Sequence, residues 1–154
     1  MFYFTMVNDF KYPVIAFAKG GILHFARNAD DMTICSRRGW KNGFYNGLNV
    51  LDCEGSSYKV REAEKVENVG FLWGFSFLLG QKIRVRLNYT KVEKEISVDD
   101  FKEKIIKVLK RDRHFWDSGG TLEEIITITK SAKSHGDVIK YLTGIFYKET
   151  EKGL

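Results

Sequence analysis

The hydrophobic pattern of this chain changes its period near Ser97, and that change limits the fold more than any other feature. Before it, Lys82–Tyr89 alternates strictly between polar and apolar residues, a pattern typical of a strand with one buried face. After it, Phe101, Ile105 and Val108 recur at offsets of four and three, which is typical of an amphipathic helix. A chain with its strands first and its helices last favours an α+β fold with an antiparallel sheet.

Two β-hairpins are predicted in the first half of the chain. The apolar runs 13–18 and 22–26 flank Gly20-Gly21, and glycines supply the positive φ angles that a tight hairpin turn demands. A second pair of runs, 48–52 and 58–61, flanks a turn in which an aspartate is followed three residues later by a glycine. The sheet is therefore expected to be built from hairpins.

One short early helix and one buried strand are predicted between and after these hairpins. Asn28 followed by Asp30 and Asp31 is typical of a helix start, and Gly39 is a matching stop. A helix of about ten residues is expected between them. The glycine-bounded segment 70–80 is the most hydrophobic of the chain, and it predicts a strand buried along most of its length.

About three C-terminal helices are predicted, and we expect them to pack on the sheet. Ser97 caps the first and Thr121 the second, each with acidic residues in the following turn. His135 is expected at the C-terminal end of the second helix, where its partial positive charge suits the helix dipole. Asp137 then caps the third helix. The β-branched run 125–129 would also suit a strand by propensity, which leaves two interpretations of the second helix.

The length and composition fit a single domain over residues 1–154, with 149–154 as a frayed tail. The chain is 44% hydrophobic and shows no internal repeat or low-complexity linker. No apolar run reaches the about 20 residues of a membrane span, and the first residues lack the basic region of a signal peptide. Two cysteines are too few for a disulfide framework. We therefore expect a cytoplasmic protein without a membrane partner.

The positive charge of the chain is concentrated in one stretch. Residues 82–116 hold eleven Lys or Arg and six Asp or Glu, which matches the net charge of +5 of the whole chain. Basic residues that gather on one surface attract an anionic partner by long-range steering. The alternative is that they lie on the ordinary solvated faces of a strand and a helix.

Catalytic, metal and cofactor motifs are missing from the sequence. The three histidines, His24, His114 and His135, accompany no Gly-x-Ser-x-Gly elbow, and neither cysteine is close to a histidine in sequence. Paired acidic residues stand at predicted helix starts, where the helix dipole explains them. No metal-ligand spacing or phosphate-binding glycine loop is present. The sequence therefore predicts a non-enzymatic protein without cofactor or metal.

Protein binding is the function that the distribution of aromatic residues and arginines favours. Loop aromatics and arginines dominate the energetics of protein interfaces. The predicted partner-binding residues are Trp40, Phe44, Tyr45, Lys82, Arg84, Arg86, Arg111, Arg113, His114 and Trp116. For the last of these, a structural alternative is that Phe115 and Trp116 close the open end of the core.

Nucleic-acid binding is the alternative function. The strand face 82–86 and the helix 98–113 carry basic residues that could follow a phosphate backbone, with aromatic residues nearby for base stacking. Acidic residues dilute the charge of the helix, and no common nucleic-acid-binding motif is present. The sequence leaves the oligomeric state open.

In style, the chain resembles the small single-domain immunity proteins that accompany bacterial polymorphic and contact-dependent toxins. The resemblance is carried by the length, the aromatic-rich sheet, the short capped helices and the stretches 37–43 and 113–116. It implies a cytosolic protein that binds and neutralises a partner toxin. Because this chain is basic, the toxin surface that it covers is expected to be acidic, unless the protein binds away from the toxin's active site.

Overall fold

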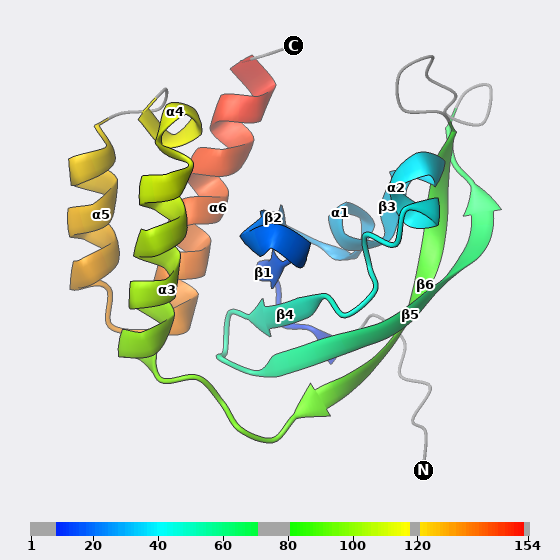
Figure 1. Cartoon of the computed structure of the whole chain (residues 1–154), viewed down its shortest axis with the longest axis horizontal. Helices are drawn as coiled ribbons and strands as arrows, with labels where there is room; N and C mark the ends of the chain where they lie inside the picture. Colours follow the sequence, from blue (N-terminus) through cyan, green and yellow to red (C-terminus); the bar gives the residue numbers. More distant parts are fainter. Residues whose placement is uncertain (1–8, 71–80, 118–120, 153–154) are drawn as a thin grey trace.

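The computed structural model of the chain describes residues 9–70, 81–117 and 121–152 (Figure 1). The strands are β1 (Val14–Phe17), β2 (Leu23–Ala26), β3 (Ile34–Ser36), β4 (Asn49–Asp52), β5 (Ser57–Asn68) and β6 (Lys82–Val92). The helices are α1 (Ala29–Thr33), α2 (Arg37–Lys41), α3 (Val98–Arg111), α4 (Arg113–Trp116), α5 (Leu122–Ser131) and α6 (His135–Lys152). The predicted α+β class with an antiparallel sheet is confirmed.

The six strands form one curled antiparallel sheet in the order β2-β1-β4-β5-β6-β3. Both predicted hairpins are present, as β1–β2 and β4–β5. The longest pairing joins β5 to β6, and it carries two register irregularities, after Val60 and after Lys65. Such bulges increase the local twist of a strand pair, which suits a sheet that curls. The predicted strand at 70–80 falls almost wholly on 71–80, which lies outside the described residues.

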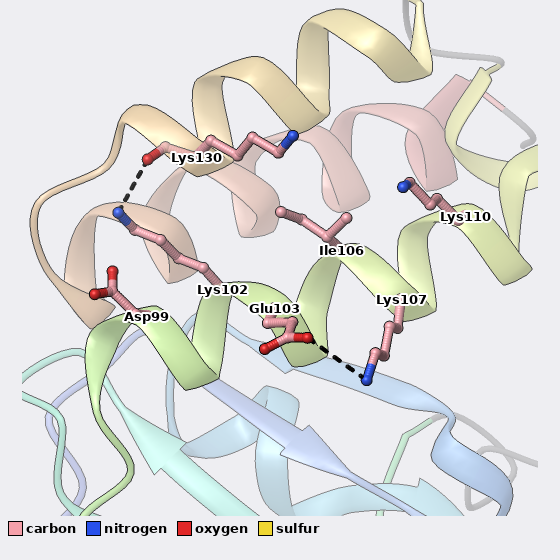
Figure 2. Close-up of a pocket in the computed structure, with 7 residues that line it drawn as sticks. All are labelled: Asp99, Lys102, Glu103, Ile106, Lys107, Lys110 and Lys130. Atoms are coloured by element: carbon pink, nitrogen blue, oxygen red, sulfur yellow. Dashed lines mark hydrogen bonds and ion pairs between the residues drawn. The ribbon is translucent and has the colours of Figure 1, made fainter.

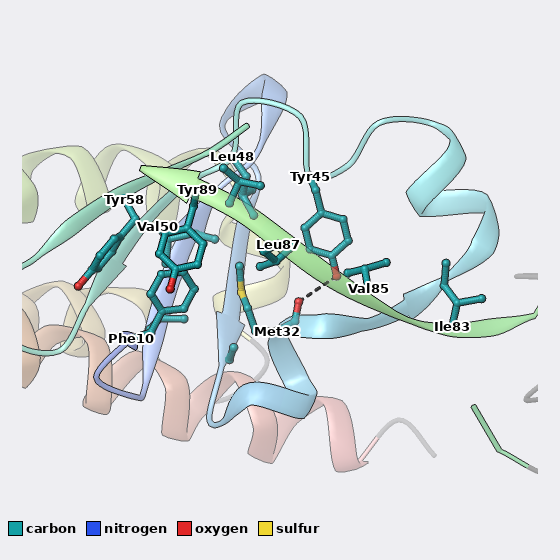
Figure 3. Close-up of a cluster of buried hydrophobic side chains, with 14 residues drawn as sticks. Phe10, Met32, Tyr45, Leu48, Val50, Tyr58, Ile83, Val85, Leu87 and Tyr89 are labelled. Atoms are coloured by element: carbon teal, nitrogen blue, oxygen red, sulfur yellow. Dashed lines mark hydrogen bonds between the residues drawn. The ribbon is translucent and has the colours of Figure 1, made fainter. Parts of the chain in front are cut away.

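The concave side of the sheet encloses one hydrophobic core, which we call the sheet core (Figure 3). The alternation predicted for β6 is confirmed, because Ile83, Val85 and Leu87 all point into this core and are at most 2% exposed. Met32 of α1 lies at its centre. The Tyr45 hydroxyl donates a hydrogen bond of 2.9 Å to the Met32 carbonyl, and this bond satisfies a polar group that burial would otherwise penalise.

The opposite face of β1, β2 and β4 packs against the layer formed by α3, α5 and α6, as Figure 1 shows. Ile15, Phe25 and Leu51 of the sheet meet Phe101 of α3 and Leu142 of α6 in this second core, the helix core. β1 therefore lies between two cores, and successive side chains alternate between them. The confirmed N-caps of α3 and α5, in which Ser97 and Thr121 accept backbone hydrogen bonds, begin two helices of this layer.

The predicted early helix is wrong in its length. Asn28 caps α1 as expected, but α1 ends at Thr33, and Ile34 and Cys35 pair with β6 as the edge strand β3. Ser36 then caps α2 by accepting a hydrogen bond of 3.1 Å from the Gly39 backbone. A β-branched residue beside an unpaired strand edge favours strand pairing over continued helix, and this contact is not visible locally in the sequence.

The predicted position of His135 is also wrong, because it begins α6 instead of ending α5. The Ser134 hydroxyl accepts a hydrogen bond from the Asp137 backbone, and the Asp137 carboxylate accepts one from the Lys133 backbone. These reciprocal bonds resemble a capping box and place the cap at Ser134 rather than Asp137. α6 then continues to Lys152, so most of the predicted tail is helical.

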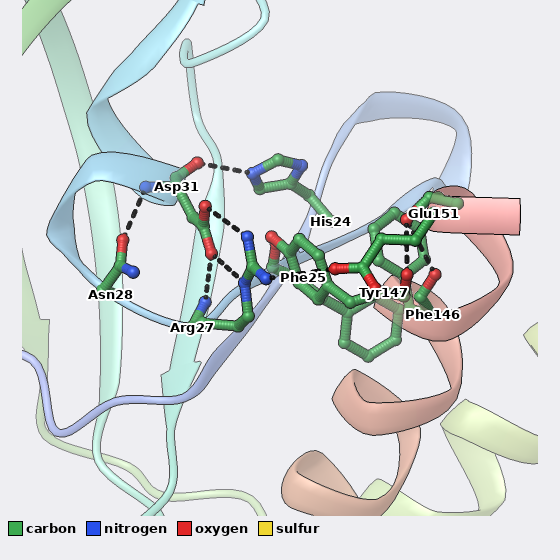
Figure 4. Close-up of polar contacts among 9 residues, drawn as sticks. His24, Phe25, Arg27, Asn28, Asp31, Phe146, Tyr147 and Glu151 are labelled. Carbon is green, nitrogen blue, oxygen red and sulfur yellow. Dashed lines mark hydrogen bonds and ion pairs between the residues drawn. The ribbon is translucent and has the colours of Figure 1, made fainter. Parts of the chain in front are cut away.

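A polar network joins β2 and α1 to α6 (Figure 4). Arg27 forms an ion pair of 2.7 Å with Asp31, and its guanidinium lies 3.7 Å from the centre of the Tyr147 ring. The Tyr147 hydroxyl donates a hydrogen bond of 2.7 Å to the Phe25 carbonyl. Partial burial raises the pKa of Asp31, but the hydrogen bonds from Arg27 outweigh it and hold that pKa below 3.8. We call these residues, with His24, the junction network.

Candidate functional site

The predicted loop aromatics fold onto the sheet core. The Trp40 indole donates a hydrogen bond of 2.7 Å to the Ala63 carbonyl, and Phe44 packs against His24 and Tyr45. Tyr45 is only 2% exposed. The ring and hydroxyl of Tyr45, a predicted partner-binding residue, are thus used within the core.

The predicted strand residues lie on the outer face of β6, where the two arginines face acids. Arg84 contacts Asp30 at 2.6 Å and Glu67 at 2.9 Å, and Arg86 contacts Glu64 at 2.8 Å. Lys82 is exposed at the beginning of the strand. Since each arginine is matched by at least one carboxylate, this face presents little net positive charge to a ligand.

The predicted residues near the end of α3 have mainly local roles. Arg111 donates hydrogen bonds to the Gly20 and Gly21 carbonyls of the β1–β2 turn and forms an ion pair with Asp112. Arg113 lies 3.5 Å from a carboxylate oxygen of Asp117.

His114 is exposed, but Trp116 is only 3% exposed and packs edge-to-face on Phe25. Trp116, a predicted partner-binding residue, therefore lies in the helix core, as the structural alternative expects. Most of the basic residues of 82–116 thus belong to β6 or to α3, which lie on different sides of the molecule in Figure 1.

The structure instead assembles a lysine-lined groove between α3 and α5, with a volume of about 430 Å³ (Figure 2). Six of its residues form one stripe along α3, and the seventh comes from α5. They are Asp99, Lys102, Glu103, Ile106, Lys107, Lys110 and Lys130. We call it the α3–α5 groove. Its four lysines outnumber its two acids.

The lysines of the groove differ in their contacts. The Lys102 ammonium donates a hydrogen bond of 3.0 Å to the Lys130 carbonyl, and Lys107 lies 3.8 Å from Glu103. That pair is weak, because both side chains are more than 70% exposed. Within the described ranges, no carboxylate lies within ion-pairing distance of the ammonium groups of Lys110 and Lys130. The groove therefore offers cations that the molecule does not neutralise.

Sequence reasoning found only part of this groove. The α3 lysines were recognised as a basic helix face, but none was singled out as a partner-binding residue. The spacing of Lys102, Ile106 and Lys110 at four residues was the available signal, since residues at that spacing share a helix face. Lys130 could not be included, because its place depends on α5 packing beside α3.

The three histidines lie in different parts of the described structure, on β2, on α4 and at the start of α6. His135 donates a hydrogen bond of 2.8 Å to the Ile96 carbonyl, His24 lies in the junction network, and His114 is on the surface. Among the residues that the structure describes, no group of three or more His, Cys, Asp or Glu side chains could hold a metal ion. No helix in those same ranges is long and apolar enough to cross a membrane.

Comparisons with protein-family models, with curated proteins and with solved structures find no match for this chain.

Proposed function

We propose that this protein acts without catalysis, by binding an acidic surface of another protein in the α3–α5 groove. The observation that carries the proposal is the set of Lys107, Lys110 and Lys130 around Ile106. Cations around one apolar side chain suit a partner that brings carboxylates around an apolar contact. A cytosolic toxin domain that the protein neutralises is the partner that the resemblance to immunity proteins favours.

A protein partner fits the groove better than nucleic acid does. Asp99 and Glu103 lie within the groove and would repel a continuous phosphate backbone. Separate carboxylates on a folded surface can meet the lysines and avoid these two acids. A nucleic acid would also need the arginines of β6 to bind its backbone beyond the groove. These arginines already face Asp30, Glu64 and Glu67.

The test compares the wild-type protein with a double variant, Lys107→Glu with Lys110→Glu. Both proteins are titrated with polyglutamate and with single-stranded and double-stranded nucleic acid, and both are used to capture partners from host lysate. The wild-type protein should bind polyglutamate and retain a partner with an acidic surface. The variant should bind both more than about tenfold more weakly. Affinity for polyglutamate should fall as salt rises.

A matched control variant reverses the charge of two lysines outside the groove, by Lys41→Glu together with Lys59→Glu. Both are exposed and the net charge changes equally. If this control loses binding as strongly as the groove variant, bulk charge explains the binding and the proposal is wrong. Tighter binding of nucleic acid than of polyglutamate by the wild-type protein would instead support the alternative function.

A further inference from the structure

A second cavity lies between the end of the sheet and the first turns of α3. It has a volume of about 180 Å³ and is lined by residues of β1, β4, β5, β6 and α3 and by the segment that leads into α3. We call it the β4–α3 pocket. It shares no residue with the α3–α5 groove, so whatever it binds is independent of the proposed function.

The floor of the β4–α3 pocket is apolar and rigid. Leu51 and Phe101 belong to the helix core and are at most 3% exposed. Phe17 packs edge-to-face on Phe101 with ring centres 6.5 Å apart, and Ile96 packs against the same core. An apolar surface fixed by a packed core keeps its shape without a ligand, so binding would require little ordering of the protein.

Two lysines lie at the pocket, and neither is neutralised. The Lys104 ammonium lies 4.0 Å from the centre of the Phe17 ring, which holds it beside the apolar floor by a cation–π contact. Lys94 lines the pocket from the segment before α3. In the part of the chain that the structure describes, no carboxylate lies within ion-pairing distance of either ammonium. The lining includes no acidic residue.

We propose that the β4–α3 pocket binds a small monocarboxylate with an apolar body, such as an aryl or short fatty acid. The body lies on the half-buried side chains of Phe17 and Ile96, which cover the core at this point, and the carboxylate faces Lys94 and Lys104. The size supports a small ligand, because pockets for drug-sized ligands usually exceed about 300 Å³. Free phosphate fits less well, because it has no apolar part to contact the floor.

The test is a titration of the whole protein with benzoate, in which amide chemical shifts in ¹H–¹⁵N NMR spectra report binding. Benzoate should give saturable shifts at the ends of β1 and β4 and in the first turns of α3. Benzyl alcohol has a similar apolar body without the charge, and it should bind more weakly. Lys104→Gln and Lys94→Gln should each weaken benzoate binding by about three- to fivefold, since each removes one partly exposed charge contact.

The control variant is Lys107→Gln, which removes a lysine of the same helix that does not line the pocket. It should leave benzoate binding unchanged. Three results would overturn the proposal: no saturable shift, equal binding of benzyl alcohol and benzoate, or equal weakening by Lys104→Gln and Lys107→Gln. Because glutamine is also a good helix former, Lys104→Gln and Lys107→Gln in α3 are expected to fold like the wild type, and so is Lys94→Gln, because Lys94 is exposed outside any helix or strand.

Discussion

The junction network and the α3–α5 groove both contain charged residues, but they use them in opposite ways. In the junction network, Arg27 meets Asp31 through two hydrogen bonds of its guanidinium and also contacts Tyr147. In the groove, Lys110 and Lys130 meet no carboxylate within the described residues. Pairing with opposite charges, rather than the number of charges, therefore distinguishes residues that stabilise the fold from residues available to a partner.

The two regions also differ in what lies beneath the charges. The side chain beneath the junction network is Phe25, which is fully buried and packs against Trp116 and Phe146. The apolar side chain that lines the groove is Ile106, which is only partly buried. If pairing and burial go together, mutations in the first region should change stability, and those in the second should change binding.

The largest effect is expected from truncating the apolar residue beneath each region. Phe25→Ala should lower the free energy of unfolding by about 3–5 kcal/mol, because it leaves a cavity in the helix core. Ile106→Ala should cost about 1 kcal/mol, since much of its side chain already contacts water. Urea unfolding followed by circular dichroism measures both values. Equal losses would show that the floor of the groove is as much a part of the core as Phe25.

A smaller effect is expected from removing one acid in each region. Asp31→Ala should lower the free energy of unfolding by about 1–2 kcal/mol, because the Asp31 side chain is only 18% exposed and accepts charged hydrogen bonds. Glu103→Ala should change it by less than about 0.5 kcal/mol, since its pair with Lys107 is exposed. The same unfolding measurement serves for both. If Asp31→Ala left the free energy of unfolding unchanged, the junction network would have no stabilising role.

The sequence predicted the parts of this fold that depend on neighbouring residues. The alternation in β6 and the caps at Asn28, Ser97 and Thr121 were correct, because a pleat and a cap are fixed by residues close in sequence. The division of 29–41 into α1, β3 and α2 was missed. It depends on pairing between Ile34 and Arg84, which are distant in the chain.

The contacts that the predicted binding residues make within the fold could not be predicted, for the same physical reason. Arg84 contacts Asp30, which is 54 positions away, and Arg111 contacts Gly20, which is 91 positions away. Local sequence shows that an arginine is present but not whether a distant acid or carbonyl meets it. Several candidate binding residues chosen by type therefore also make contacts within the fold, whereas the α3 lysines entered only as the basic helix face of the alternative function.

The smallest effect is expected from the pH dependence of His24, which belongs to the junction network. Burial lowers the pKa of His24 from 6.5, and the carbonyl and carboxylate of Asp31 oppose this only in part. The unfolded state therefore takes up a proton first as the pH falls, so stability should decrease as the pH drops below about 6.5 toward the folded-state pKa.

Chemical unfolding at about pH 7.5 and about pH 5 measures this dependence. His24→Gln should reduce the loss of stability between these two conditions, because glutamine does not titrate. The exposed His114 offers a control. In His114→Gln, the loss of stability that is due to His24 should still be measured between the two pH values. Asp31 does not interfere, because its carboxylate contributes stability that is lost only below its ordinary pKa of 3.8. A loss of equal size in the wild type and in His24→Gln would show that the junction network tolerates a charged imidazole, and would remove the contrast with the solvated groove.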